Sequence, residues 1–240
     1  MAILCRGLRR SLAGEPLLDG VDLEVRVGAR LLLVSRPDAA ASLLLRILAG
    51  LARSDRGSVR LAGLDARAAW SRRVSYVGAE PALPSWLSAA EALDLALRLH
   101  GYTRAERRRR SQAAIERYGL TGGLGPDRPM RHGGTALLQR IAFASALVGD
   151  PEVLLLDEPL RAIDPRDRQR LLSSVAPRTT MLLASRLPAS EVGLVDEVAL
   201  IREGRVALHA ALSEMERNRL PLSLRGIEAL AGVLAGRATS

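Results

Sequence analysis

Two adjacent carboxylates, Asp157 and Glu158, directly follow an apolar run at residues 153–156. A run of apolar residues without polar alternation predicts a strand that is buried on both faces of a sheet. Parallel α/β sheets bind their ligands at the carboxyl end of such strands. One carboxylate there could hold a phosphate-bound Mg²⁺, and its neighbour could orient or deprotonate an attacking water. The pair therefore points to phosphate chemistry, and a buried strand ending in an acidic turn is the alternative.

The segments on either side of the carboxylates extend this pattern. Pro159 ends the strand, and Asp164 followed by Pro165 predicts a helix with an N-cap and a proline at its first position. Upstream, residues 139–147 predict a helix and residues 149–151 a turn. Together these segments resemble the Walker B strand, the D-loop and the preceding helix of ABC transporter ATP-binding subunits.

The resemblance covers residues 3 to about 212 and implies an α/β, P-loop NTPase-like nucleotide-binding domain. Period-two alternation over residues 1–30 predicts the small antiparallel β layer of that fold. Residues 84–132 are expected to form the inserted helical subdomain, with capping boxes at Ser88 and Thr103. Residues 213–240 are expected to form a C-terminal helical tail that is broken near Pro221.

Composition limits the remaining possibilities. The chain has 240 residues and carries a net charge of +9, and all 35 of its basic residues are arginines. A single cysteine, Cys5, excludes an internal disulfide and fits a reducing cytosol. No segment resembles a signal peptide and no run of ~18 apolar residues occurs, so we expect a peripheral protein on the cytoplasmic face of the inner membrane. Three Tyr, two Trp and one Phe are too few for a stacking surface, which makes nucleic-acid binding an unfavoured role.

The resemblance implies a phosphate loop, Gly-x-x-Gly-x-Gly-Lys-Ser-Thr, after the apolar run at residues 31–34. The corresponding positions are Ser35, Asp38 and Ala40 for the glycines, Ala39 between the last two, Ala41 for the lysine, Ser42, and Leu43 for the threonine. Only Ser42 keeps the family residue. Asp38 places a negative charge where a polyphosphate would lie, and the missing lysine removes a charge-assisted contact of roughly 1.5–3 kcal/mol. Arg36 or Arg46 could substitute in principle, although a guanidinium is bulkier and differently directed.

Four other nucleotide-contact positions of the family are also substituted. Leu12 replaces the aromatic residue that stacks on adenine, Ala79 replaces the Q-loop glutamine, and Arg186 replaces the switch histidine. An ungapped alignment places the signature on Gly133, Gly134, Thr135, Ala136 and Leu137, with Gly134 in the position of the serine. An alternative register keeps Gly133 and Gly134 as the double glycine and places His132 in the serine position.

The resemblance and these substitutions together predict a non-hydrolysing pseudo-ATPase. Glu158, the catalytic base of the family, is retained in it but does not support ATP hydrolysis. Summed naively, the lost contacts would cost more than ~8 kcal/mol of binding free energy. That is about the whole binding free energy of a nucleotide held at micromolar affinity. No cofactor is expected in the chain's own site, and Ser42 and Asp157 would hold Mg²⁺ only if nucleotide binds. The implied partners are a membrane permease and an intact ABC ATPase subunit, which would share ATP and Mg²⁺ across a heterodimer interface that includes Asp164. The alternatives are a working ATPase that uses partner contacts, and a soluble basic interaction or nucleic-acid-binding module.

Overall fold

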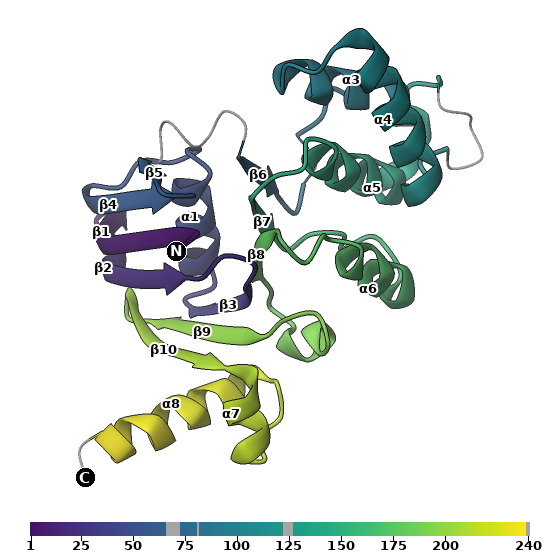
Figure 1. Cartoon of the computed structure of the whole chain (residues 1–240). Helices are drawn as coiled ribbons and strands as arrows, with labels where there is room; N and C mark the ends of the chain where they lie inside the picture. The colour runs from purple at the N-terminus through teal and green to yellow at the C-terminus, as the bar shows by residue number, and fades with distance from the viewer. Residues whose placement is uncertain (66–72, 81, 122–126, 239–240) are drawn as a thin grey trace.

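The computed structural model describes residues 1–65, 73–80, 82–121 and 127–238, and it contains two β-sheets with helices around them (Figure 1). The larger sheet has six strands in the order β10-β9-β3-β8-β7-β6. Its strands are β3 (Arg30–Arg36), β6 (Val74–Val77), β7 (Val153–Asp157), β8 (Thr180–Ala184), β9 (Glu197–Arg202) and β10 (Arg205–Ala211). All neighbours pair in parallel except β9 and β10, which form a closing antiparallel pair. The strands predicted from the apolar runs are confirmed.

The smaller sheet is the predicted antiparallel β layer. It contains β1 (Ile3–Leu12), β2 (Glu15–Val25), β4 (Arg56–Leu61) and β5 (Leu64–Asp65), in the order β2-β1-β4-β5. Ala13 and Gly14 form the turn that joins β1 to β2, and they adopt positive φ angles of 50° and 86°. Helix α1 (Ala39–Leu48) packs between the two sheets, because its buried leucines belong to the same core as both.

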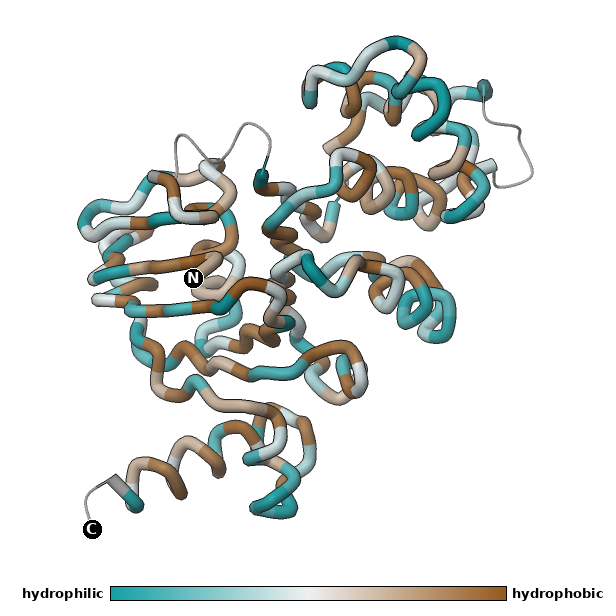
Figure 2. The backbone as a smooth tube through the Cα atoms, in the orientation of Figure 1, coloured by the Kyte–Doolittle hydropathy of each residue, from teal (hydrophilic) through white to brown (hydrophobic). Residues whose placement is uncertain are grey.

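The central strands are apolar along their whole length because both faces of the larger sheet are covered. Every residue of β7 and of β8 is buried. The β layer and α1 cover one face, and a second core of helices covers the other. Figure 2 shows hydrophobic residues concentrated on these inner strands and hydrophilic residues on the outer turns of the helices. This packing fixes the carboxyl ends of β3, β7 and β8 at one edge of the sheet.

The helical region consists of α3 (Ala89–Leu99), α4 (Arg104–Tyr118), the 3₁₀ turn η1 (Met130–His132) and α5 (Gly134–Leu147). Both predicted capping boxes are present, at Ser88 and at Thr103. The fully buried Phe143 of α5 meets the ring of Tyr118 edge-on at a centroid distance of 6.2 Å. This contact joins α4 to α5, the helix that precedes β7. The limits of an inserted subdomain at 84–132 stay a prediction, and residues 122–126 of it lie outside the described residues.

The remaining helices follow the sheet strands. Helix α6 (Pro165–Ser173) comes after β7, and the 3₁₀ turn η2 (Pro188–Glu191) comes after β8. Helices α7 (Leu212–Arg217) and α8 (Leu224–Ala238) form the chain's C-terminal part, with Pro221 between them as predicted. In the part of the chain that the structure describes, no helix has both the length and the apolarity needed to cross a membrane.

Candidate functional site

Asp157 is the last residue of β7, and both of its carboxylate oxygens are hydrogen-bonded. Ser42 Oγ donates to Oδ1 at 2.7 Å, and the Tyr76 hydroxyl donates to Oδ2 at 3.1 Å. Burial and the nearby Asp157 carboxylate raise the pKa of Tyr76, so its hydroxyl stays protonated and remains a donor. The structure thus brings together Ser42 and Asp157, the two predicted Mg²⁺ ligands. Tyr76 was not among the predicted site residues, because its contact with Asp157 depends on the pairing of β6 with β7.

Glu158 follows with an unusual backbone conformation, because its φ angle is 49°. A positive φ in a residue other than glycine costs on the order of 1–3 kcal/mol, and such residues cluster at active sites as well as occurring in tight turns. Its side chain accepts a 2.6 Å hydrogen bond from the backbone N–H of Arg186. Burial raises the pKa of Glu158, while the Arg186 N–H and the charges of Arg186 and Arg161 act in the opposite direction.

The loop after β3 is closed by its own hydrogen bonds. Ser35 Oγ donates to the carbonyl of Asp38 and accepts the N–H of Ala41, both at 3.0 Å. The N–H of Ala40 donates to the carbonyl of Pro37, also at 3.0 Å. The first N–H groups of a helix have no partner within the helix, and a phosphate loop directs them at phosphates. Here α1 already begins at Ala39, and the N–H groups of Ala40 and Ala41 have partners inside the loop.

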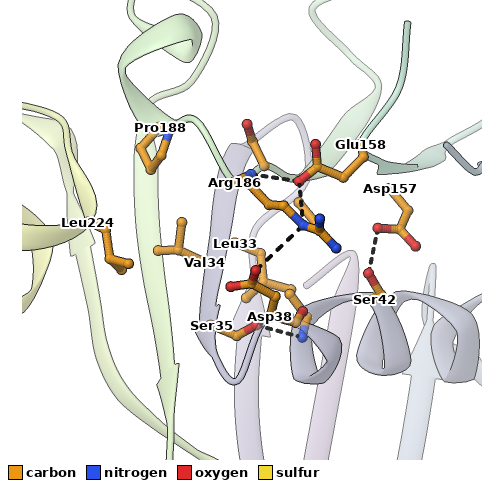
Figure 3. Close-up of a pocket in the computed structure, with 13 residues that line it drawn as sticks. Leu33, Val34, Ser35, Asp38, Ser42, Asp157, Glu158, Arg186, Pro188 and Leu224 are labelled. Carbon is orange, nitrogen blue, oxygen red and sulfur yellow. Dashed lines mark hydrogen bonds and ion pairs between the residues drawn. The ribbon is translucent and has the colours of Figure 1, made fainter. Parts of the chain in front are cut away.

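A charged cluster faces this loop (Figure 3). Arg186 Nε lies 3.5 Å from Asp38 Oδ2 and 3.8 Å from Glu158 Oε1. Asp38 and Arg186 are therefore ion-pair partners across the site, which the sequence did not indicate because they lie far apart in the chain. The cavity that remains between β3, α1 and the carboxylates measures about 30 Å³. At roughly 10–15 Å³ of probe-occupied volume per water, that is room for about two water molecules.

The C-terminal helix α8 lies beside the same loop. Leu224 contributes to the wall of the cavity, and Glu228 forms a 2.7 Å ion pair with Arg36. Figure 3 shows Leu224 next to Val34 and Pro188 at the side of the cavity. The sequence predicted a helical tail but gave no indication that it reaches the loop.

Gln139 connects two further segments that contain predicted site residues. It is buried in α5, where its Nε2 donates to the carbonyl of Ala79 at 3.1 Å and its Oε1 accepts the N–H of Ala162 at 2.8 Å. Asp164 caps α6 as predicted, because its Oδ1 accepts the N–H groups of Arg166 and Asp167. A buried glutamine amide bonded to two loop backbones is a structural role that sequence spacing alone does not reveal.

The remaining predicted positions lie away from the cavity. Leu12 ends β1 and is 43% exposed, and it is not part of the cavity wall. The candidate signature residues 133–137 form the start of α5, with Gly133 as its N-cap and Gly134 at a φ angle of 72°. Such a backbone suits glycine and would strain a serine. Both registers of the signature stay open.

Comparisons with known proteins agree with this fold. The family model described as "ABC transporter" matches residues 18–161. The daunorubicin/doxorubicin resistance ATP-binding protein DrrA of Streptomyces peucetius is 31% identical over 222 residues, which are 90% of this chain and 67% of that protein. The aliphatic sulfonates import ATP-binding protein SsuB 1 of Mesorhizobium japonicum is 33% identical over 213 residues, 86% of this chain and 78% of that protein.

Solved structures show the same architecture. An ATP-binding subunit of an ABC transporter superposes with a TM-score of 0.81 at 21% identity, covering 91% of this chain and 93% of that one. The ATP-binding cassette MJ0796, in a dimeric post-hydrolysis state with ADP and Pi, has a TM-score of 0.76 at 17% identity, covering 88% and 98%. This chain therefore belongs to the ABC transporter family as an ATP-binding subunit, with the fold of its nucleotide-binding domain.

Proposed function

We propose that this chain is a non-hydrolysing ABC subunit whose own phosphate loop does not hold nucleotide. The observation that carries the proposal is that two backbone N–H groups of the loop already have hydrogen-bond acceptors inside it. The N–H groups of Ala40 and Ala41 are bonded to Pro37 and Ser35. A phosphate would have to displace these bonds, and it would gain no lysine in return because the chain contains none.

The charge of the cavity opposes a polyphosphate as well. Among the described residues that line it, the carboxylates of Asp38, Asp157 and Glu158 face a single guanidinium, that of Arg186, which leaves a net charge of −2. Arg186 is already paired with Asp38 and Glu158. Oxygen donors such as Ser42 and Asp157 suit Mg²⁺, but Mg²⁺ in such sites is held largely through substrate phosphates. The residues present fit the metal but not the nucleotide that would bring it.

The proposed partner is an intact ABC ATPase subunit. Family subunits pair head to tail, so each nucleotide lies between one subunit's phosphate loop and the other subunit's signature. In a heterodimer, the partner's loop would face residues 133–137 of this chain, where the N–H groups of Thr135 and Ala136 could meet a γ-phosphate. Asp164 would contribute across the same interface. At most one site of the pair, the one on the partner's loop, would then hold ATP and Mg²⁺.

The second proposed partner is a membrane permease, which would hold the subunit at the cytoplasmic face of the membrane. A groove of about 290 Å³ runs between the end of β6 and α5, with Leu51 and Leu83 in its wall. Leu51 is 58% exposed, and Trp86 at the start of the helical region is 67% exposed. An exposed leucine in the wall of a groove could contribute to a protein–protein contact. We therefore propose that residues 84–132 and this groove dock the permease.

The test is calorimetry of the full chain with Mg-ATP. We expect a Kd weaker than about 1 mM, and micromolar binding would contradict the proposal. A variant with Asp38→Gly, Ala40→Gly and Ala41→Lys should gain at least tenfold in affinity, because it removes the opposing charge and restores the loop and its cation. Asp127→Gly with Ala113→Lys gives the same change in net charge at exposed positions and should leave affinity unchanged.

A working ATPase that uses partner contacts is the second candidate, favoured by the hydrogen bond between Ser42 and Asp157. The two candidates differ in what Glu158→Gln does to ATP hydrolysis by the complex purified with its partners. The non-hydrolysing subunit predicts an unchanged rate. A loss of more than tenfold would establish Glu158 as a working catalytic base and favour the second candidate.

A further inference from the structure

A further groove, lined by several charged side chains, lies in the helical region between α3 and α4. It measures about 480 Å³, and Figure 1 shows these two helices at the end of the molecule opposite α8. The residues that line it are Ala90, Asp94, Arg104, Arg107, Arg108, Ser111, Gln112 and Ile115. None of these residues lines the nucleotide site or the groove along α5, although all of them lie within residues 84–132, the region proposed to dock the permease.

The groove carries an excess of positive charge. Arg107 Nε donates to Asp94 Oδ1 at 2.6 Å, and its Nη1 donates to the carbonyl of Tyr102 at 3.1 Å. Arg104 and Arg108 are exposed and have no ion pair among the described residues. Three guanidinium groups against one carboxylate leave the groove with a net charge of +2.

The lining also includes an unsatisfied hydroxyl. Ser111 is only 8% exposed, and its Oγ is buried with no hydrogen-bond partner in the described part of the chain. Buried polar groups are normally paired, and an exception calls for an explanation such as a ligand or a bound water. Residues 104, 108 and 111 follow one another at helical spacing, so their side chains occupy one face of α4. Two guanidinium groups and a hydroxyl on one face form a donor set suited to a phosphate group.

We propose that this groove binds the phosphate of an anionic phospholipid headgroup, held by Arg104 and Arg108 with Ser111 as an additional donor. The excess of guanidinium groups favours a lipid over a free phosphate, because each arginine near a surface of anionic headgroups adds attraction. The proposal does not depend on whether the chain binds nucleotide.

Vesicle sedimentation of the full chain tests the proposal. The protein should bind vesicles with 30 mol% phosphatidylglycerol in phosphatidylcholine at least tenfold more tightly than pure phosphatidylcholine. Each arginine near an anionic surface contributes about fivefold in affinity. Arg104→Gln with Arg108→Gln should therefore weaken binding by about 25-fold. Arg56→Gln with Arg202→Gln, at exposed arginines with no ion pair among the described residues, should weaken it by less than threefold. Equal losses in the two double variants would mean diffuse attraction and would overturn the site.

Ser111→Ala separates a binding role from a structural one. Because the hydroxyl is unpartnered, the alanine variant should keep or raise the Tm of the free chain, while its affinity for the anionic vesicles falls by at least threefold. An unchanged vesicle affinity would remove Ser111 from the site and contradict the donor set. Inorganic phosphate and glycerol phosphate are the soluble probes. If either raises the Tm of the wild type but not that of the Arg104→Gln, Arg108→Gln variant, while anionic vesicles do not bind, the ligand is a soluble phosphate and the lipid assignment is wrong.

Discussion

The two sides of the candidate site differ in how much of the family pattern they retain. On the β7 side, Asp157 and Glu158 remain, and the α5 helix that precedes the strand keeps Gln139 and Arg140. On the β3 side, Ser42 is the only residue of the phosphate loop that matches. The polar groups on the substituted β3 side nevertheless have partners, as those on the β7 side do. Ser35 bonds to the backbone of the loop, and Asp38 forms an ion pair with Arg186.

This difference shows that retained carboxylates do not by themselves indicate catalysis. Asp157 anchors two hydroxyl groups, from Ser42 and Tyr76, and Glu158 accepts the N–H of Arg186. Both residues therefore have structural partners that would preserve them in a chain without nucleotide. The substitutions at Asp38 and Arg186 likewise compensate each other in charge. These contacts are compatible with the proposal that the phosphate loop of this chain does not hold nucleotide.

Removing Asp157 should have the largest effect on stability. Asp157→Ala leaves the partly buried hydroxyls of Ser42 and Tyr76 without their acceptor, so the free energy of unfolding should fall by about 1–3 kcal/mol. Asp157→Asn keeps an acceptor oxygen and serves as the matched control, with a loss below about 1 kcal/mol. Urea denaturation measures both. Equal stability of the alanine variant and the wild type would show that the carboxylate is not an anchor.

Gln139→Ala should have a somewhat smaller effect. It removes hydrogen bonds to the carbonyl of Ala79 and the N–H of Ala162, and the expected loss is about 1–2 kcal/mol. Gln112→Ala, at an exposed glutamine of α4, should change stability by less than about 0.5 kcal/mol. If thermal denaturation shows no difference between the two variants, the link between the Ala79 and Ala162 segments is dispensable.

The ion pair between Asp38 and Arg186 should contribute less. Their side chains are 59% and 61% exposed, and pairs of this kind couple by about 0.2–1 kcal/mol. A double-mutant cycle with Asp38→Asn and Arg186→Gln measures the coupling, which should shrink at 1 M salt through screening. A coupling of zero at low salt would mean that the two substitutions do not compensate each other.

Glu158→Gln should give the smallest effect, and its sign depends on pH. Because burial raises the pKa of Glu158, folding favours the protonated acid, and the stability this contributes at low pH is lost as the pH rises through the folded pKa. The glutamine variant should therefore be slightly more stable than the wild type at pH 7, by less than about 0.5 kcal/mol. The difference should vanish near pH 4. A glutamine variant that is less stable at pH 7 would show that Arg186 outweighs burial.

The sequence predicted the strands and the capping boxes, because apolar runs and N-cap residues act locally. It could not predict which distant side chains would meet. Tyr76 reaches Asp157 through the parallel register of β6 and β7, which sequence periodicity does not fix. The pairing of Arg36 with Glu228 depends on where α8 packs after Pro221. Nor could the sequence show that Ser35 would take up the N–H of Ala41, because a loop of that composition has no standard conformation.

The central claim is that this chain's own phosphate loop stays empty in the assembled transporter. The most direct measurement is a structure of the complex, purified with its partners, in the presence of Mg²⁺ and a non-hydrolysable ATP analogue. We expect nucleotide density only on the partner's loop, facing residues 133–137 of this chain, with Arg186 still beside Asp38. Nucleotide density beside Ser42, or a symmetric dimer of this chain alone, would contradict the account.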